Sequence, residues 1–507
     1  MQYLVIATYF GVLLLIGLVA SRRVHTLSDY YVGGKQLGPW AAAFSARATG
    51  ESAWLYLGLT GLGAAVGVPA LWVVVGEIVG VAGGWFLMAR PFKAAADRYD
   101  AITIPDYLVG RFARGPDAEH WARVLRWVAA TALAGFVTIY VSAQIDATGK
   151  AFDSFLAWNY YGGVLVGFGI VVTYTWSGGF LAVAWSDLVQ GLIMLVALVV
   201  LPVTAAMALG SDGLRVAING LDPALLSLWG LGGITWPNLL TLVGYVAIGL
   251  GFLGSPQVFV RFISIRSDRD ICTGRWIALA FTLLTDTGAV LAGLFGRAIL
   301  VGDGGDFAAT LGADGELVMP VLVRSLFPTA IIGVYVAAVL AATMSTIDSL
   351  LVVASSAVTH DVYRHVGGIT RSDGTLTRLS RRITVGLGLV ALAIAIAVSL
   401  IAPDRTIFWY VIFGFSGIAA TFCPMMILSL AWPRYNVYGA LASMISGIVA
   451  IPFFKFVLPL VPGWGPLIAR AEELAPSFAV ALLAGIAATL LTSGGQSAQD
   501  SGLKAEA

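Results

Sequence analysis

Long apolar runs dominate this chain, and most have the length of a helix that crosses a lipid bilayer. A spanning helix needs about 20 consecutive apolar residues. The first run is too long for a signal-peptide core and lacks a small-residue cleavage site, so we interpret it as a helix. The pattern predicts about thirteen transmembrane helices in an all-α membrane protein, over residues 2–20, 38–65, 69–92, 122–147, 158–178, 183–208, 236–262, 275–300, 325–359, 383–402, 407–429, 435–458 and 474–492.

Composition agrees with lipid as the solvent. Of the 507 residues, 59% are hydrophobic and 11% are charged, whereas a soluble domain carries about 25% charged residues. The net charge of +1 argues against a nucleic-acid partner. The two cysteines, Cys272 and Cys423, form no metal or redox spacing. Residues 493–507 are short and polar, and we expect a disordered cytoplasmic tail there.

The distribution of lysine and arginine predicts the orientation, because cytoplasmic loops are enriched in both. Eighteen of these residues lie in one set of alternate loops, and five lie in the other set. The richer side holds Arg22, Arg23, Lys35, Lys93, Arg98, Arg111, Arg114, Arg123, Arg126, Arg261, Arg266, Arg269, Arg275, Arg364, Arg371, Arg378, Arg381 and Arg382. With thirteen helices, the N-terminus is predicted outside and the C-terminus in the cytoplasm.

Polar residues interrupt the second predicted helix over residues 46–52. This stretch places Arg47, Glu51, two hydroxyl side chains and Gly50 near the middle of the membrane. Each ionisable side chain there costs about 2.5–3.5 kcal/mol on insertion scales. A helix broken at that depth also frees backbone carbonyls, which lipid cannot satisfy. The segment is therefore predicted to line a site walled by protein, as in a transporter.

The seventh predicted helix has a second break. Its sequence carries Gly249, Gly251 and Gly254 before Pro256, and proline cannot continue a regular helix. Interrupted segments at corresponding places in two halves of a chain indicate a substrate site between inverted repeats. The alternative is an ordinary proline kink.

The ninth predicted helix carries hydroxyls and a carboxylate within the apolar run. Ser345 and Thr346 offer neighbouring oxygens that suit a hard cation such as Na⁺, and Ala342 lies one turn earlier. Such pairs in membrane helices more often bond the carbonyl four residues back. Asp348 favours an ion role, because carboxylates inside the membrane are functional candidates by default.

Motifs in these regions match a known family. The chain resembles the sodium:solute symporter family, and within it the bacterial sodium/proline symporters. The matching segments are LSDYYVGGKQLG at 27–38, TIPDY at 103–107, GGFLAVAWSD at 178–187, GSPQ at 254–257 and ATMST at 342–346.

The resemblance implies a core of two inverted five-helix repeats, the fold of the leucine transporter class. The first repeat would span residues 38–208 and the second 236–429, after a helix and loop at 1–37 and before two extra helices at 430–492. The family's sodium site combines backbone carbonyls at the first break with oxygens of the eighth core helix. Carried over to this sequence, its residues are Ala48, Glu51, Ala342, Ser345 and Thr346.

The resemblance also implies further ion and substrate residues. Asp187 matches an acidic residue that serves sodium in some relatives, although a helix-start carboxylate favoured by the helix dipole would look the same. With Asp348, it is a candidate for a second ion or for the ion path. The candidate substrate residues are Arg47, Ser52, Trp54, Tyr140, Gln144, Ile248, Phe252, Pro256 and Gln257.

The chain departs from the proline pattern within this set. Ile248 stands where a tryptophan is expected, Phe252 where a tyrosine is, and Gly50 where an acid is. Arg47 replaces a small residue; it either pairs with Glu51 four residues on or holds a substrate carboxylate. Three more ionisable residues lie inside helices, where we expect pairing or gating roles: Glu77, Asp286 and Arg297.

We therefore expect a sodium-coupled symporter that imports a small solute by alternating access across a bacterial plasma membrane, with the monomer sufficient. Proline is the first candidate, and another amino acid or a short monocarboxylate is the alternative. A transporter-like sensor is a second class. An enzyme is not expected, because the four histidines lie in predicted cytoplasmic loops or at helix ends and form no catalytic cluster.

Overall fold

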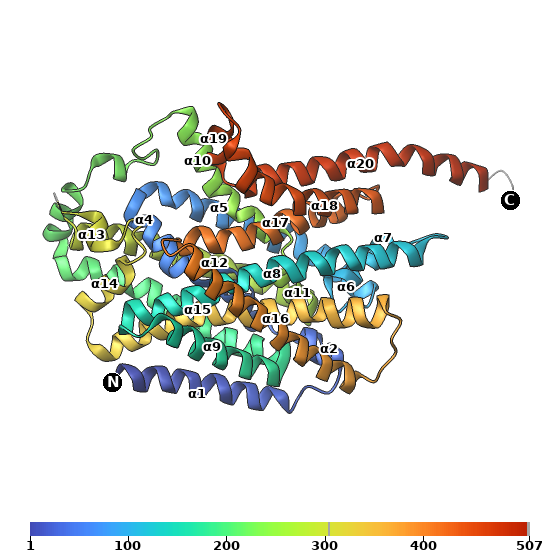
Figure 1. The fold of residues 1–507 in the computed structure, drawn as a ribbon, viewed down its shortest axis with the longest axis horizontal. Helices are drawn as coiled ribbons and strands as arrows, with labels where there is room; N and C mark the ends of the chain where they lie inside the picture. Colours follow the sequence, from blue (N-terminus) through green and yellow to red (C-terminus); the bar gives the residue numbers. More distant parts are fainter. Residues whose placement is uncertain (303–304, 504–507) are drawn as a thin grey trace.

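The computed structural model describes residues 1–302 and 305–503, with the side chains of residues 214 and 493–503 outside that description. Helices form the framework of the described residues, and a single parallel bridge joins Leu37 to Ile265. Most helices run along the long axis of the molecule, with α1 beginning toward one end of that axis and α20 ending at the other (Figure 1). The predicted disordered tail falls largely on residues outside the description and stays a prediction.

The helices of the first half follow the predicted runs. Their bounds are α1 (Gln2–Ser21), α2 (Leu27–Val32), α3 (Pro39–Ala53), η2 (Trp54–Leu59), α4 (Thr60–Val66), α5 (Leu71–Ala82), η4 (Gly83–Met88), α6 (Ala89–Arg98), α7 (Ile104–Phe112), α8 (Ala118–Leu156) and α9 (Tyr160–Asn219). In α9, Gly179 has a φ of +54° that interrupts the helix between the two spans predicted there.

The second half is built in the same way. Its bounds are α10 (Trp236–Ala247), η6 (Ile248–Leu253), α11 (Pro256–Ser264), α12 (Asp268–Leu300), α13 (Phe307–Leu311), α14 (Val318–Leu326), α15 (Thr329–Ser356), η7 (Ala357–Val366), α16 (Asp373–Ile401), α17 (Ile407–Ala431), α18 (Val437–Pro452), η8 (Phe453–Val457), α19 (Gly465–Ile468) and α20 (Leu474–Leu503).

Eleven helices of the described residues are long and apolar enough to cross a membrane. One of them, Tyr160–Gly213, contains two of the predicted spans. The predicted span over 38–65 is not among the eleven, and it is the segment that carries Arg47 and Glu51. The helical class of the protein is thus confirmed, while the number thirteen stays a prediction.

Two of the matched motifs are helix starts. Thr26 precedes α2 and accepts a hydrogen bond from the Asp29 amide at 3.1 Å. Thr103 precedes α7 and accepts from the Asp106 amide, also at 3.1 Å. In each case a threonine cap and an acidic residue three positions on satisfy free amides of the first turn. LSDYY and TIPDY therefore fix short helices next to the bundle.

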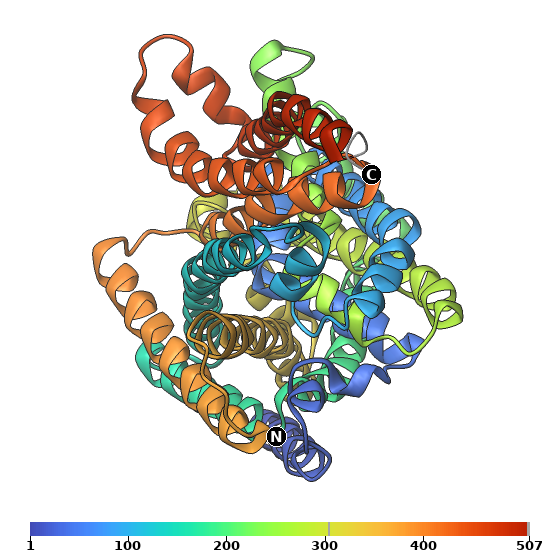
Figure 2. The ribbon, with the colours of Figure 1, turned by 90° about the vertical axis from the view of Figure 1, so that its right-hand side faces the viewer.

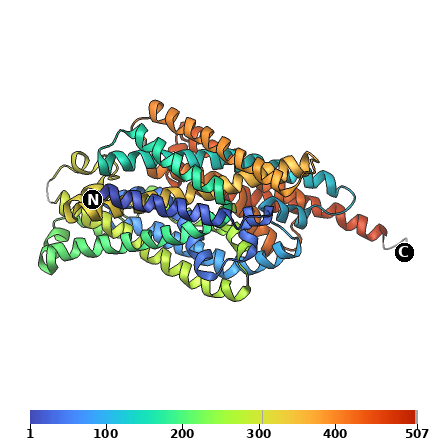
Figure 3. The ribbon, with the colours of Figure 1, turned by 90° about the horizontal axis from the view of Figure 1, so that it is seen from below.

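Burial separates inner helices from outer ones. The apolar windows of α15 and α17 are 78% and 89% buried, against 28% for α1 and 22% for α16. Viewed end-on, α1 and α16 lie at the periphery (Figure 2), and from below α1 runs lengthwise across the near face (Figure 3). The outer helices expose apolar side chains such as Leu15, Leu18 and Ile401, as contact with lipid requires.

Candidate ion and substrate site at the broken helices

The first break lies at Ser52, whose φ of +41° and ψ of −166° end the regular helix α3. Side chains supply the hydrogen bonds that the backbone loses there. The Ala53 amide donates to Gln144 Oε1 of α8 at 3.0 Å. The Trp54 indole donates to the Gly50 carbonyl at 3.1 Å. The predicted break is therefore present, and buried protein groups hold it in place.

The hydroxyl pair of α15 faces this break. Ser345 Oγ lies 2.9 Å from the Ala48 carbonyl oxygen, and Thr346 Oγ1 lies 3.0 Å from that of Thr49. Both hydroxyls also lie 3.1 Å from the Ala342 carbonyl of their own helix. Two hydroxyls and three carbonyls thus place neutral oxygen ligands, which suit Na⁺, at one buried point between α3 and α15.

Four of the five predicted sodium residues meet at this point. The carbonyl of Glu51, the fifth, accepts a hydrogen bond from the Trp54 amide, and its predicted role as a sodium ligand stays a prediction. The Thr49 carbonyl is an additional oxygen that the sequence comparison did not indicate. The sequence could have indicated the Thr49 carbonyl, because a helix break frees several successive carbonyls rather than one.

Arg261 organises the surroundings of Asp187. Its guanidinium lies 3.1 Å from Asp187 Oδ2 and also donates to Thr49 Oγ1 at 2.8 Å. We predicted Arg261 among the cytoplasmic loop charges; this placement was wrong, because α11 continues past it and the side chain is fully buried. Asp348 belongs to the same region and accepts from the Tyr174 hydroxyl at 2.8 Å. Any ion at Asp187 must therefore compete with an internal cation.

Arg47 forms the predicted ion pair with Glu51 and a second pair with Glu77 at 2.9 Å. Its guanidinium carbon lies 4.6 Å from the centre of the Phe252 ring, a cation–π distance. Arg47 Nε has no acceptor among the described residues. The pairing alternative is thus present, and a substrate carboxylate would meet an arginine already held by two acids.

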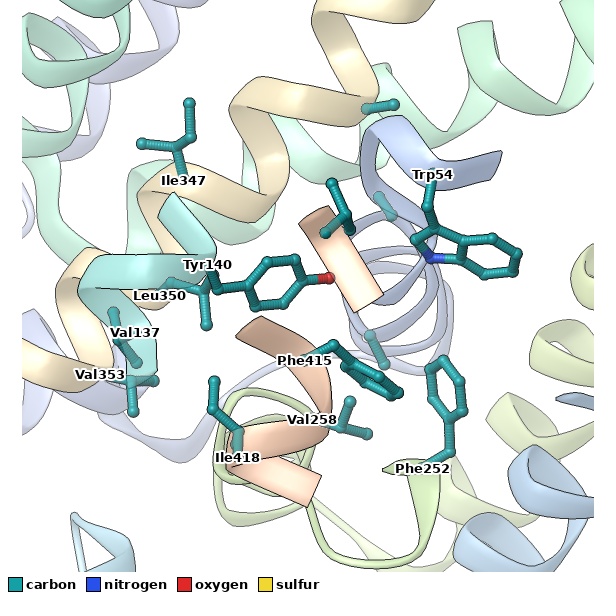
Figure 4. Packing of buried hydrophobic residues seen from close by; sticks show 14 of the residues in the cluster. Trp54, Val137, Tyr140, Phe252, Val258, Ile347, Leu350, Val353, Phe415 and Ile418 are labelled. Carbon is teal, nitrogen blue, oxygen red and sulfur yellow. The ribbon is translucent and has the colours of Figure 1, made fainter. Parts of the chain in front are cut away.

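Aromatic side chains of four elements lie near the two breaks, and one of them, Phe252, contacts Arg47. Figure 4 shows the rings of Trp54, Tyr140, Phe252 and Phe415 pointing toward one another from η2, α8, η6 and α17. Phe252 and Phe415 lie 5.6 Å apart, and Tyr140 and Phe415 lie 6.2 Å apart, measured between ring centres. These buried rings lie on the elements that carry or adjoin the two breaks.

The remaining candidate substrate residues lie on the same elements or on the helices packed against them. The Ser52 hydroxyl neighbours that of Tyr140. Ile248 and Pro256 are buried in η6 and at the start of α11. Gln144 Nε2 and Gln257 Oε1 have no hydrogen-bond partner among the described residues. All nine candidates are buried, so a substrate can enter only after the helices move apart.

A second polar network ties α7, α8 and η7 together. Arg126 pairs with Asp106 at 2.8 Å and with Asp361, and His360 lies 3.0 Å from Asp106. We predicted Arg126 as a loop charge, whereas α8 carries it into this buried contact. Burial disfavours the ionised Asp106, but the hydrogen bond from His360 and the nearby Arg126 outweigh it and hold the pKa of Asp106 below its usual range.

Comparison with known proteins decides the family. The model of the sodium:solute symporter family matches residues 30–447. The chain belongs to the sodium:solute symporter family. It is 33% identical to the osmoregulated proline transporter OpuE of Bacillus subtilis, over 96% of this chain and 93% of that one. It is 35% identical to the high-affinity proline transporter PutP of the same organism, over 89% and 93%. The sodium/proline symporter of Escherichia coli is 33% identical over 88% and 86%.

Solved structures share the fold. A Na⁺-coupled sialic acid symporter in a substrate-bound, outward-open state superposes with a TM-score of 0.78 at 18% identity, covering 97% of both chains. MhsT in complex with L-phenylalanine gives a TM-score of 0.50 at 16% identity, covering 89% of this chain and 98% of that one. These likenesses confirm the predicted fold of the leucine transporter class.

Family membership confirms several predictions from the sequence. The protein is a sodium-coupled symporter of a small solute and not an enzyme, and Na⁺ is its coupling ion. It is a multi-pass membrane protein.

Proposed function

We propose that this symporter imports proline together with sodium by alternating access. The observation that carries the ion site is the pair of hydroxyls, Ser345 and Thr346, set against carbonyls freed by the break in α3. Proline is supported by relatives named as proline transporters, at 33–35% identity over most of the chain. The aromatic rings and amide side chains between the breaks suit a small zwitterion with an apolar body.

Sodium would act by exchanging hydrogen bonds for ligands. In the structure each hydroxyl donates to a carbonyl. An arriving Na⁺ would replace these hydrogen bonds, with the oxygen lone pairs of hydroxyls and carbonyls turned toward it, and would hold α3 against α15. Coupling follows when the ion binds one conformation more tightly than the other. The membrane potential adds about 2.3 kcal/mol per charge for each 100 mV.

A different amino acid or a short monocarboxylate is the second candidate substrate. Arg47, Ile248 and Phe252 favour it, since they depart from the proline pattern at the binding region. A carboxylate without an amine would need Arg47, whereas a zwitterion would also find the acids around it. Asp187 and Asp348 are proposed to lie on the ion path, with Arg261 as the internal competitor.

The orientation of the chain, the bounds of the repeats and the oligomeric state are part of the same proposal. The N-terminus would lie outside and the C-terminus in the cytoplasm of a bacterial cell. Residues 38–208 and 236–429 would form the two inverted repeats, and the monomer would be sufficient for transport.

Uptake into liposomes tests the proposal. The purified chain, given an inward sodium gradient, is offered a panel of radiolabelled amino acids and short carboxylic acids. We expect accumulation of proline that collapses when the gradient is abolished. Accumulation of another solute with proline inert would replace the substrate, and sodium-independent accumulation would overturn the proposed ion site.

A further inference from the structure

Two acidic side chains that the sequence left without partners meet Glu51 inside the bundle. Glu77 comes from α5 and Asp286 from α12, and Glu51 from the broken helix α3. One carboxylate oxygen from each lies within 4.8 Å of the other two. None of the three residues has exposed surface. We call Glu51, Glu77 and Asp286 the acidic triad.

The acidic triad carries more negative charge than its surroundings balance. Among the described residues, Arg47 is the one basic group in an ion pair with it, through Glu51 and Glu77. Three carboxylates and one guanidinium sum to a charge of −2 when all are ionised. An uncompensated charge in a protein interior costs several kcal/mol. A further positive charge would therefore stabilise the cluster.

Unused oxygens mark where that charge would lie. Arg47 contacts Glu51 Oε1 and Glu77 Oε2, and Thr285 donates to Asp286 Oδ1 at 3.0 Å. The second oxygen of each acid, Glu51 Oε2, Glu77 Oε1 and Asp286 Oδ2, is buried without a donor among the described residues. Each triad member thus keeps one oxygen free.

The spacing fits a metal cation better than a proton. Hard cations hold oxygens at about 2.3–2.6 Å, so oxygens around one ion lie at most about 5 Å apart. One cation could therefore contact an oxygen of each of the three acids, whereas one proton bridges a single pair of oxygens. Carboxylate oxygens are the ligands that such cations prefer.

We propose that the acidic triad is a second sodium site, separate from the neutral oxygens of α3 and α15. The inference rests on the proposed function, because it adds a second coupling ion to the same transport cycle. Both sites share the break in α3: the first uses its carbonyls, and the second uses the Glu51 side chain. A second Na⁺ would double the contribution of the membrane potential to accumulation.

Equilibrium binding of radioactive sodium to the purified full-length chain tests the site. We expect about two ions per chain in the wild type and about one in Asp286→Asn, because one carboxylate ligand is lost. The Asp286→Asn variant leaves both ion pairs of Arg47 in place. If Asp286→Asn misfolds, Glu77→Gln serves as the second variant. Glu473→Gln is the matched control, since it changes a buried acid that pairs with Lys455 instead; its stoichiometry should equal that of the wild type.

Each outcome separates the inference from the proposed function. One ion in the wild type, unchanged in folded Asp286→Asn but lost in Ser345→Ala with Thr346→Ala, would overturn the second site and leave the first intact. The second site would also be overturned if the wild type bound one sodium ion and took up one proton, and Asp286→Asn no longer took up that proton. Absence of sodium binding in the wild type would contradict the proposed function itself.

Discussion

At the scale of the residue, the ion site depends on two ordinary hydroxyls in an unusual place. Ser345 and Thr346 bond the Ala342 carbonyl, as such residues do in many membrane helices. What distinguishes them is the second acceptor that each finds across the interface, on the far side of the broken helix. Replacing both residues with alanine therefore removes two ligands and leaves little empty space: one oxygen at Ser345, and one oxygen and one methyl group at Thr346.

Ser345→Ala combined with Thr346→Ala should raise the sodium concentration for half-maximal uptake about tenfold, a loss of about 1.4 kcal/mol of binding free energy. Initial uptake rates in liposomes at stepped sodium concentrations measure this. Ser355→Ala, on the same helix and bonded only to Val352 among the described residues, should leave the value unchanged. An unaltered sodium requirement in the double variant would move the ion site elsewhere.

The positive charge of Arg47 compensates the buried carboxylates of Glu51 and Glu77. Arg47→Met should lower the free energy of unfolding by about 3–5 kcal/mol, because it leaves buried carboxylates without their cation. Adding Glu77→Gln should recover part of the loss by removing one of those charges. Thermal unfolding of the purified protein in detergent compares the two variants.

Arg297→Met is the matched control for this comparison. Arg297 donates to the carbonyls of Ala64 and Ala65 and pairs with no carboxylate among the described residues. Its loss should therefore cost less than that of Arg47. A double variant no more stable than Arg47→Met alone would show that charge balance is not what holds Arg47.

At the scale of the element, the second break depends on close contact between helices. The helix α5 crosses η6 with backbones touching: a Cβ at Gly80 would lie 1.9 Å from the Gly249 carbonyl oxygen, and one at Gly249 would lie 1.8 Å from that of Gly76. Only glycine allows this approach. The crossing fixes the second break beside the helix that carries Glu77.

Gly80→Ala should force α5 and η6 apart and cost about 1–3 kcal/mol or more, as overpacking does. We expect a lower midpoint of thermal unfolding and reduced transport. Gly135→Ala is the control, because a Cβ there meets nothing within 4 Å. Equal behaviour of the two variants would mean that the crossing relaxes at no cost.

At the scale of the whole molecule, charge and burial define two ends and a lipid-facing surface. The start of α1 and the end of α20 lie toward opposite ends of the long axis (Figure 1). Loops rich in lysine and arginine are retained in the cytoplasm, so the end that carries Arg371 should face inward. The loop between α9 and α10 should then face outward.

Single cysteines test this orientation in a chain whose Cys272 and Cys423 are replaced by serine. Leu231→Cys, at a residue that is 72% exposed in the outer loop, should react with a membrane-impermeant maleimide in intact cells. Arg371→Cys, exposed in the predicted cytoplasmic loop, should react only after the membrane is disrupted. The reverse pattern would invert the predicted topology.

The sequence by itself determined the class of the protein and the location of its breaks. Apolar runs reveal spanning helices because lipid admits few other structures. The costly residues at 46–52, the Gly–Pro segment at 249–256 and the hydroxyls of the ninth predicted helix stand out for the same reason. Family motifs then connected these segments to a sodium site between them.

The tertiary structure decided which buried groups meet, because charges far apart in the chain find partners only through packing. Glu77 and Asp286 stood in separate helices without assigned partners, and the fold brings both to Glu51. Arg261 and Arg126 looked like loop charges, since helix ends cannot be located accurately from hydropathy; the fold buries them against Asp187 and Asp361. A sequence pattern records what each helix contains, while only packing sets the distances that make an ion site.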